Sequence, residues 1–262
     1  MKLWMAVLTL AALLTCGCSS AVRAESPTAS KDLTLDSSVD DVLDALDALG
    51  DGLNDFTADV KMTTADGATG LESTRSGAVW FQNQSEGESR LRVTFETKEE
   101  DGLEKTEKIE YMLDDGWLVD RDYKKKIEVK RQVLRPGEKI NLLKLGEGPF
   151  PLPIGQDKAD AHKLFDITKI AASKDDPEST VHLELKPRKG SQFERKFHAI
   201  DVWVDLKTHM PRRIGTSNVP QTELRTTDLS NVRVNPGLKD EDFALPAVSE
   251  KEWTQHAEPY ED

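Results

Sequence analysis

The chain has 262 residues, a formal net charge of −13, and 32% charged against 37% hydrophobic residues, which is enough apolar content for a core beneath a strongly charged surface. The length suits one large β-rich domain, and we expect a single one. An acidic surface repels phosphate backbones, and no basic stripe with interleaved aromatic residues is present, so the composition argues against nucleic-acid binding.

The first 24 residues have the pattern of an export signal. Lys2 supplies a positive start, Leu3–Leu14 an apolar run, and Ala24 a small residue at the cleavage position. The apolar run is about a dozen residues long, short of the roughly 20 that a membrane-spanning helix needs. We therefore predict a cleaved signal peptide over 1–24 and a periplasmic mature protein.

Cys16 and Cys18 directly follow the apolar run and are candidate lipidation sites, as in bacterial lipoproteins. Neither is a clean match, because Thr15 precedes Cys16 where Gly or Ala is usual, and also stands three residues before Cys18. Two outcomes stay open. Cleavage after Ala24 leaves a cysteine-free protein without disulfides, whereas modification of a cysteine gives a form anchored in a membrane and facing the periplasm.

Residues 25–35 are polar and are predicted to form a flexible leader, after which a helix begins. Ser37 or Ser38 can cap its first amides, and Asp40 and Asp41 suit its positive end. Gly50 is expected to end it. The apolar stripe consists of Val39, Val42, Leu43, Leu46 and Leu49.

Beyond the helix the hydrophobic period changes from 3.6 to 2, as expected for strands with one face on a core. This alternation predicts about ten antiparallel strands, joined by turns such as Asp66-Gly67. The predicted strands span 56–63, 77–82, 90–96, 109–113, 117–120, 127–129, 181–186, 200–206, 212–214, 223–228 and 232–234.

Prolines at alternate positions in 149–153 interrupt this pattern, with helices predicted at Ile140–Leu145 and Gln156–Phe165 on either side. Residues 248–262 are acidic and lack periodicity, so we expect a loose tail that Trp253 could pin to the body. The predicted fold is mainly β with a few helices: a single domain over 36–247 built on a strongly curved antiparallel sheet, with helices covering an apolar core or cavity.

The stretch Tyr111-Met-Leu-Asp-Asp-Gly-Trp117 predicts a hairpin that can form in two pairing registers, one with a two-residue loop and one with a three-residue loop. A two-residue loop pairs Tyr111 with Asp120 and places a carboxylate on the apolar face. A three-residue loop with Gly116 as a bulge pairs Leu113 with Trp117 and keeps the apolar residues together. We expect the second register, with Trp117 facing the interior.

Signs of catalysis or metal binding are weak. The five histidines show no metal-type spacing, and HExxH, GxSxG and glycine-rich phosphate motifs are missing. Asp120-Arg-Asp-Tyr-Lys124 begins like a calcium loop, but it has a lysine at the third ligand position and lacks the glycine. We therefore expect no catalytic residue, no metal and no cofactor, with acid–base work by surface carboxylates as the one enzymatic alternative.

The order of these segments resembles that of the outer-membrane lipoprotein carriers, the LolA-like proteins. The resemblance covers most of 36–246 and rests on "LNDFTADVKMTT" (53–64), "SGAVWFQ" (76–82), "YMLDDGWLVDRDYKKKIEV" (111–129), "GPFPLPIG" (148–155), "AIDVWVDLKTHMPRRI" (199–214) and "NVRVNPGLKDEDFALP" (231–246). It implies an incomplete, half-open β-barrel with a helical lid over an apolar cavity that holds the acyl chains of a lipoprotein.

By this resemblance the protein is a monomeric periplasmic carrier of acylated lipoprotein or lipid, with inner- and outer-membrane transfer partners. The alternatives are a lipid-anchored receptor or a periplasmic regulatory module of the same fold. The carriers hold the lid closed with an arginine, and that position here is Asn83. The residues expected to line the cavity are Phe56, Val60, Met62, Val79, Phe81, Val93, Phe95, Tyr111, Leu113, Trp117, Val202 and Val204.

Overall fold

The computed structural model describes residues 32–84, 88–135, 138, 142 and 154–260. The signal peptide, both candidate lipidation sites and the predicted helix Ile140–Leu145, apart from Leu142, lie outside the described residues. The helices are α1 (Val39–Gly52), α2 (Lys158–Leu164) and α3 (Asp240–Phe243). The strands are β1 (Asp55–Asp66), β2 (Glu72–Asn83), β3 (Ser89–Glu100), β4 (Leu103–Asp114), β5 (Trp117–Asp122), β6 (Ile127–Gln132), β7 (Phe165–Ile170), β8 (Thr180–Pro187), β9 (Phe197–Asp205), β10 (Pro211–Asn218), β11 (Glu223–Val234) and β12 (Thr254–Glu258).

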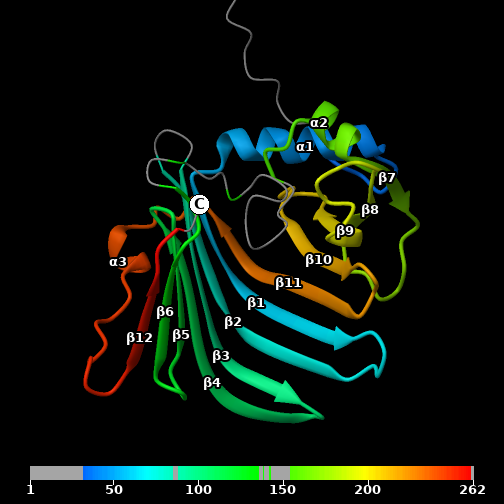
Figure 1. Cartoon of the computed structure of the whole chain (residues 1–262). Helices are drawn as coiled ribbons and strands as arrows, with labels where there is room; N and C mark the ends of the chain where they lie inside the picture. The colour runs from blue at the N-terminus through cyan, green and yellow to red at the C-terminus, as the bar shows by residue number, and fades with distance from the viewer. Residues whose placement is uncertain (1–31, 85–87, 136–137, 139–141, 143–153, 261–262) are drawn as a thin grey trace, which may run out of the picture.

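Within the described residues these strands form one twelve-stranded sheet in the order β12-β6-β5-β4-β3-β2-β1-β11-β10-β9-β8-β7. The meander β2 to β6 grows from one side of β1, and β7 to β11 returns to its other side. The sheet curves strongly and stays open, with β12 and β7 as its edges (Figure 1). The predicted fold class, a mainly β protein with a curved, incomplete barrel, is confirmed.

The helix α1 begins as the sequence predicts. The Ser38 hydroxyl accepts a hydrogen bond from the Asp41 amide, and the Asp41 carboxylate accepts one from the Ser38 amide at 2.9 Å, which completes a capping box. Its apolar stripe, including Val42 and Leu46, is buried in the core. Among the described residues, no helix is long and apolar enough to cross a membrane.

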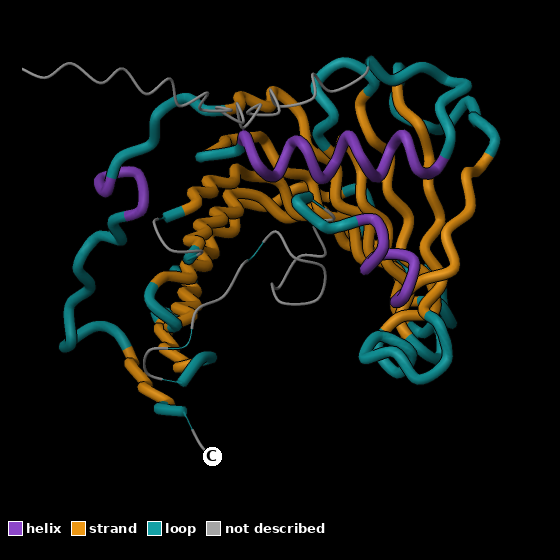
Figure 2. Tube along the Cα trace, turned by 90° about the horizontal axis from the view of Figure 1, so that it is seen from above, coloured by secondary structure: helices purple, strands orange, loops and turns teal. Residues whose placement is uncertain are grey.

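Gly50 does not end α1, which continues to Gly52, so that part of the prediction is wrong. Its role is close contact instead: a Cβ at Gly50 would lie 2.2 Å from the Cα of Gly155, and the Gly155 amide donates to the Leu46 carbonyl at 3.0 Å. The segment leading into α2 therefore touches the backbone of α1. Figure 2 shows both helices lying across one end of the curved sheet.

The core lies between these helices and the concave face of the sheet. Phe56 of β1 stacks on Phe81 of β2 with ring centroids 5.3 Å apart, and Phe165 stacks on Phe193 at 5.1 Å. On the opposite, convex face, Trp80 lies beneath Arg92, and Trp203 stacks on His182. Trp80 and Trp203 thus contact other side chains of the sheet.

The expected loose C-terminal tail is instead attached to the sheet. The strap, as we call residues 237–260, crosses the convex face, and its strand β12 pairs in parallel with β6 (Figures 1 and 2). The Trp253 ring packs edge-on against that of Tyr123 at 5.1 Å, as the sequence allowed. The sequence missed β12 because every one of its side chains is exposed, so it has no apolar alternation.

The expected register of the β4–β5 hairpin is wrong. Leu113 pairs with Leu118 and Tyr111 with Asp120, so the loop has two residues. Asp115 and Gly116 both have positive φ angles, 47° and 72°, as the tight hairpin turn that suits strand twist requires. Trp117 consequently lies on the convex side, opposite Asp114, and Leu118 takes the concave side.

Gly77 lies where the backbones of β2 and β3 approach closely, beside a register shift in both strands. A Cβ there would lie 1.8 Å from the Thr94 carbonyl oxygen. We expect Gly77→Ala to lower the free energy of unfolding by about 1–3 kcal/mol, because backbone would have to move. Urea denaturation followed by circular dichroism measures this.

The matched control is Gly52→Ala at the end of α1, where an added Cβ meets no heavy atom within 4 Å. It should change the free energy of unfolding by less than about 1 kcal/mol. Equal denaturation midpoints for the two variants would contradict the close packing of β2 on β3.

Candidate functional site: an open cavity on the concave face

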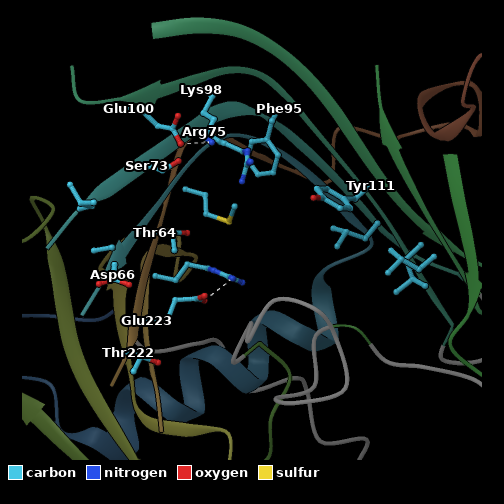
Figure 3. Close-up of a pocket in the computed structure, with 17 residues that line it drawn as sticks. Thr64, Asp66, Ser73, Arg75, Phe95, Lys98, Glu100, Tyr111, Thr222 and Glu223 are labelled. Atoms are coloured by element: carbon cyan, nitrogen blue, oxygen red, sulfur yellow. Dashed lines mark hydrogen bonds and ion pairs between the residues drawn. The ribbon is translucent and has the colours of Figure 1, made fainter. Parts of the chain in front are cut away.

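The concave face holds a cavity of about 650 Å³. Its walls come from β1 to β5 and β11 and from the loops that join them, as Figure 3 shows. Met62, Thr64 and Asp66 of β1 share the parity of Phe56, which places them on the same face as the core. The cavity thus continues the core towards the tips of the hairpins.

One part of the cavity wall is apolar. Neighbouring strands bring its side chains together, because Leu91 pairs with Leu113 and Leu113 with Leu118 across β3, β4 and β5. The Phe95 and Tyr111 rings meet edge to face at 6.4 Å. The apolar lining consists of Met62, Leu91, Phe95, Tyr111, Leu113 and Leu118.

The other part of the wall, towards the hairpin tips, is charged. It contains Asp66, Arg75, Lys98, Glu100, Glu223 and Arg225. Arg75 pairs with Glu107 at 3.0 Å, Arg225 with Glu223 at 2.9 Å, and Lys98 with Glu100. The hydrogen bond from Lys98 holds the pKa of the Glu100 carboxyl below its usual range. The site is therefore amphiphilic, with an apolar region and a region of paired charges.

The expected cavity residues fall into three groups. Met62, Phe95, Tyr111 and Leu113 line the cavity. A second group is buried in the hydrophobic core: Phe56, Val60, Val79, Phe81, Val93, Val202 and Val204. Trp117 lies on the convex side through the corrected register. Whether any of the twelve binds a ligand stays a prediction.

Sequence reasoning missed Leu91, Leu118 and the charged wall. Leu91 belongs to the alternating pattern of β3 and could have been included. Leu118 was assigned to the wrong face by the hairpin register. Arg75 and Arg225 lie beyond the apolar stretches of their strands, yet their positions, opposite Met62 and Thr64 of β1, follow from counting in steps of two along the pairing.

Asp120 is a carboxylate on the concave face, opposite Tyr111. Burial raises the pKa of Asp120, and the nearby Asp122 adds to this while Arg131 opposes it. Burial also raises the pKa of the Tyr111 hydroxyl, and the charge of Asp120 contributes. The apolar wall therefore continues into a poorly solvated polar pair.

Asn83, at the position of the carriers' latch arginine, still connects the sheet to the end of α1. Its side-chain amide donates to the Leu53 carbonyl at 2.6 Å, and its amide oxygen accepts from the Ser89 hydroxyl at 2.9 Å. Its backbone amide donates to the Asn54 carbonyl at 2.7 Å. Asn83 fixes the exit of α1 through neutral hydrogen bonds.

Metal chemistry finds little support in the geometry. Across the described parts of the chain, no three histidine, cysteine or acidic side chains come together as metal ligands. His162 and His182 each contact one aspartate, Asp40 and Asp201. Both pairs lie away from the cavity lining.

Comparisons place this architecture among several solved structures. No protein-family model matches the chain, and no curated protein sequence does either. The structure is similar to that of the LolA superfamily protein NE2245 from Nitrosomonas europaea, at 14% identity and a TM-score of 0.32 over 80% of this chain and 98% of that one. It is also similar to LprF from Mycobacterium bovis, at 14% identity and a TM-score of 0.43 over 79% and 96%.

A third similar structure is the Pseudomonas aeruginosa MucA/MucB complex, at 14% identity and a TM-score of 0.45. That match covers 79% of this chain and spans only 61% of the other. Identities and TM-scores this low carry no argument about function. The open, curved sheet with helices across one end is nevertheless the architecture that the LolA-like resemblance implied.

The buried carboxyl of Asp120 predicts a pH effect on stability. Its pKa is raised in the folded state, so its ionised form costs stability above that pKa, and the cost disappears as the pH falls below the unfolded value. We expect Asp120→Asn to raise the urea midpoint at about pH 7 and to match the original protein near about pH 3.

The control is Asp115→Asn, which removes the same charge at the exposed hairpin tip, where asparagine tolerates the positive φ of 47°. It should leave the midpoint almost unchanged at both pH values. A larger stabilisation by Asp120→Asn at the acidic pH would refute the assigned direction.

Proposed function

We propose that the protein is a non-enzymatic carrier that shields the acyl chains of a lipoprotein or lipid within the concave cavity. The observation that carries this proposal is the amphiphilic wall: an apolar region formed by side chains such as Met62, Phe95 and Leu118, continuous with a charged region at the hairpin tips. An acylated molecule has the same two-part character. Its chains would occupy the apolar region and its polar group the charged one.

The energetics favour such a ligand. Each methylene removed from water contributes about 0.8 kcal/mol, so a chain of several methylenes gains a useful affinity without any strong polar contact. The volume of about 650 Å³ lies within the roughly 300–1,000 Å³ typical of ligand pockets. The paired charges at the other end stay partly solvated, so a bound polar group need not be fully dehydrated.

Release of cargo requires a change in the cover rather than a chemical step. α1 and α2 lie across one end of the concave side and are joined by the ion pair of Asp44 with Lys158 at 2.8 Å, while Gly50 touches Gly155 in the segment before α2. We propose that they move together as a lid, with open and closed forms whose populations respond to cargo or to a transfer partner at the inner or outer membrane.

A charge placed in the apolar wall tests the carrier function. Met62→Glu should weaken binding of a fluorescent fatty-acyl probe at least tenfold, because the acyl chain would have to dehydrate a carboxylate. Titration of the purified protein with the probe measures the dissociation constant. Native mass spectrometry should show lipid bound to the original protein and little bound to the variant.

Thr63→Glu is the matched control, since it adds the same charge one residue along β1 on the convex face. It should bind the probe as the original protein does. Absence of any acyl ligand from the original protein, both as purified and after adding probe, would count against the carrier function.

Location and anchoring belong to the same proposal. We propose export to the periplasm as a monomer after cleavage of residues 1–24, with the lipid-anchored receptor and the regulatory module as alternatives. The mass of the mature N-terminus separates these forms: a chain beginning at Glu25 is free to shuttle, whereas an acylated start at Cys16 or Cys18 identifies an anchored protein.

A further inference from the structure

Side chains of the sheet hold the strap on the convex face, largely by donating hydrogen bonds to it. These donors come from β2, β3 and β5, and most of the acceptors are backbone carbonyls. The hydrogen bonds run from Gln82 to the Leu238 carbonyl at 2.9 Å, from Arg90 to the Asp240 carboxylate at 2.7 Å, from Arg92 to the Asp242 carbonyl at 2.9 Å and from Arg121 to the Pro246 carbonyl at 2.7 Å. The sheet thus presents a row of cationic donors, which we call the arginine row (Arg90, Arg92 and Arg121).

All three members of the arginine row are oriented by hydrogen bonds to side chains of the sheet. Arg90 donates to Gln82 at 2.9 and 2.6 Å. Arg92 donates to Glu110 at 2.8 Å, and Arg121 donates to Glu128 at 2.6 Å. Burial opposes ionisation of Glu110, but hydrogen bonds from Tyr123 and Arg92 outweigh it and lower the pKa of Glu110. These arginines therefore keep their charge and direction whether or not the strap is in place.

The strap itself contributes little apolar burial. Phe243 is the one strap side chain that is fully buried, and the Arg90 guanidinium lies 4.2 Å from its ring centroid. Its ion pairs, such as Lys126 with Glu252 and Arg131 with Glu258, are half exposed and contribute little. A segment with one buried anchor, a half-buried Trp253 and solvated ion pairs opens locally at low cost.

The last part of the strap binds by strand addition. Thr254 to Glu258 pair in parallel with β6 through the main chain, and all five side chains are exposed. Without β12, β6 would be a free edge of the sheet. Main-chain pairing of this kind accepts many sequences, as in domains that recognise extended peptides.

We propose that the arginine row and the edge of β6 form a docking groove for an acidic peptide segment of a partner protein, and that the strap occupies this groove in the resting protein. The occupant follows from charge complementarity: Arg90, Lys126 and Arg131 of the groove pair with Asp240, Glu252 and Glu258 of the strap. The partner segment is therefore acidic, carries aromatic side chains at the positions of Phe243 and Trp253, and ends in an extended stretch. This groove lies on the opposite face from the cavity, so the proposal does not depend on the cargo.

The test uses the full-length chain and a fluorescein-labelled peptide with the sequence of residues 237–260. Phe243→Ala removes the buried anchor of the strap and should free the groove. The variant should therefore bind the peptide at least tenfold more tightly than the original protein does, with the dissociation constants measured by fluorescence anisotropy. Affinity should fall with rising salt. A peptide with lysine in place of Asp240, Glu252 and Glu258 should bind at least tenfold more weakly to the same variant.

Lys251→Ala, at an exposed strap position, is the control and should bind the peptide as the original protein does. If Phe243→Ala does not fold, the double variant Asp240→Lys with Glu258→Lys loosens the strap at exposed side chains and is judged by the same criteria. The proposal is overturned if the folded, loosened chain does not bind the acidic peptide, or if it binds the lysine peptide equally well. A dimer of the original protein in light scattering that Phe243→Ala abolishes would assign the groove to a second copy and overturn the partner.

Discussion

The structure depends on the pairing register of a single open sheet. Because side chains alternate between two faces along every strand, each pairing decides which residues meet the cavity and which meet the strap. On β3, Leu91 and Phe95 turn to the concave side, while Arg90 and Arg92 turn to the convex side. One sheet thereby carries an apolar cavity on one face and a cationic row on the other, without a second layer of strands between them.

Much of this architecture follows from local sequence signals, and the failures have identifiable physical causes. The cap of α1, its stripe and the alternation of β1 depend on nearby residues, and each was predicted correctly. Gly50 was misread because its reason is the approach of Gly155, a contact distant in sequence. The β4–β5 register was misread because apolar alternation was weighed above the preference of Asp115-Gly116 for a two-residue turn.

Only part of the candidate site could be predicted. Met62, Phe95, Tyr111 and Leu113 line the cavity, but the deeper residues on the same face pack against α1 and the segment before α2. Alternation gives the face of a residue, whereas its distance from the covering helix decides whether it lines a cavity or fills the core. The position of the strap could not be predicted, because it has no apolar pattern of its own. Hydrogen-bond donors on distant strands position it instead.

The parallel pairing of β12 with β6 also has a consequence for how the chain reaches its final form. A chain is made from its N-terminus, so β6 exists before its neighbour β12. Until β12 is made, β6 is an edge able to pair with a neighbouring chain. Pairing of the strap thus covers β6 and makes β12, whose side chains are all exposed, the edge strand on that side.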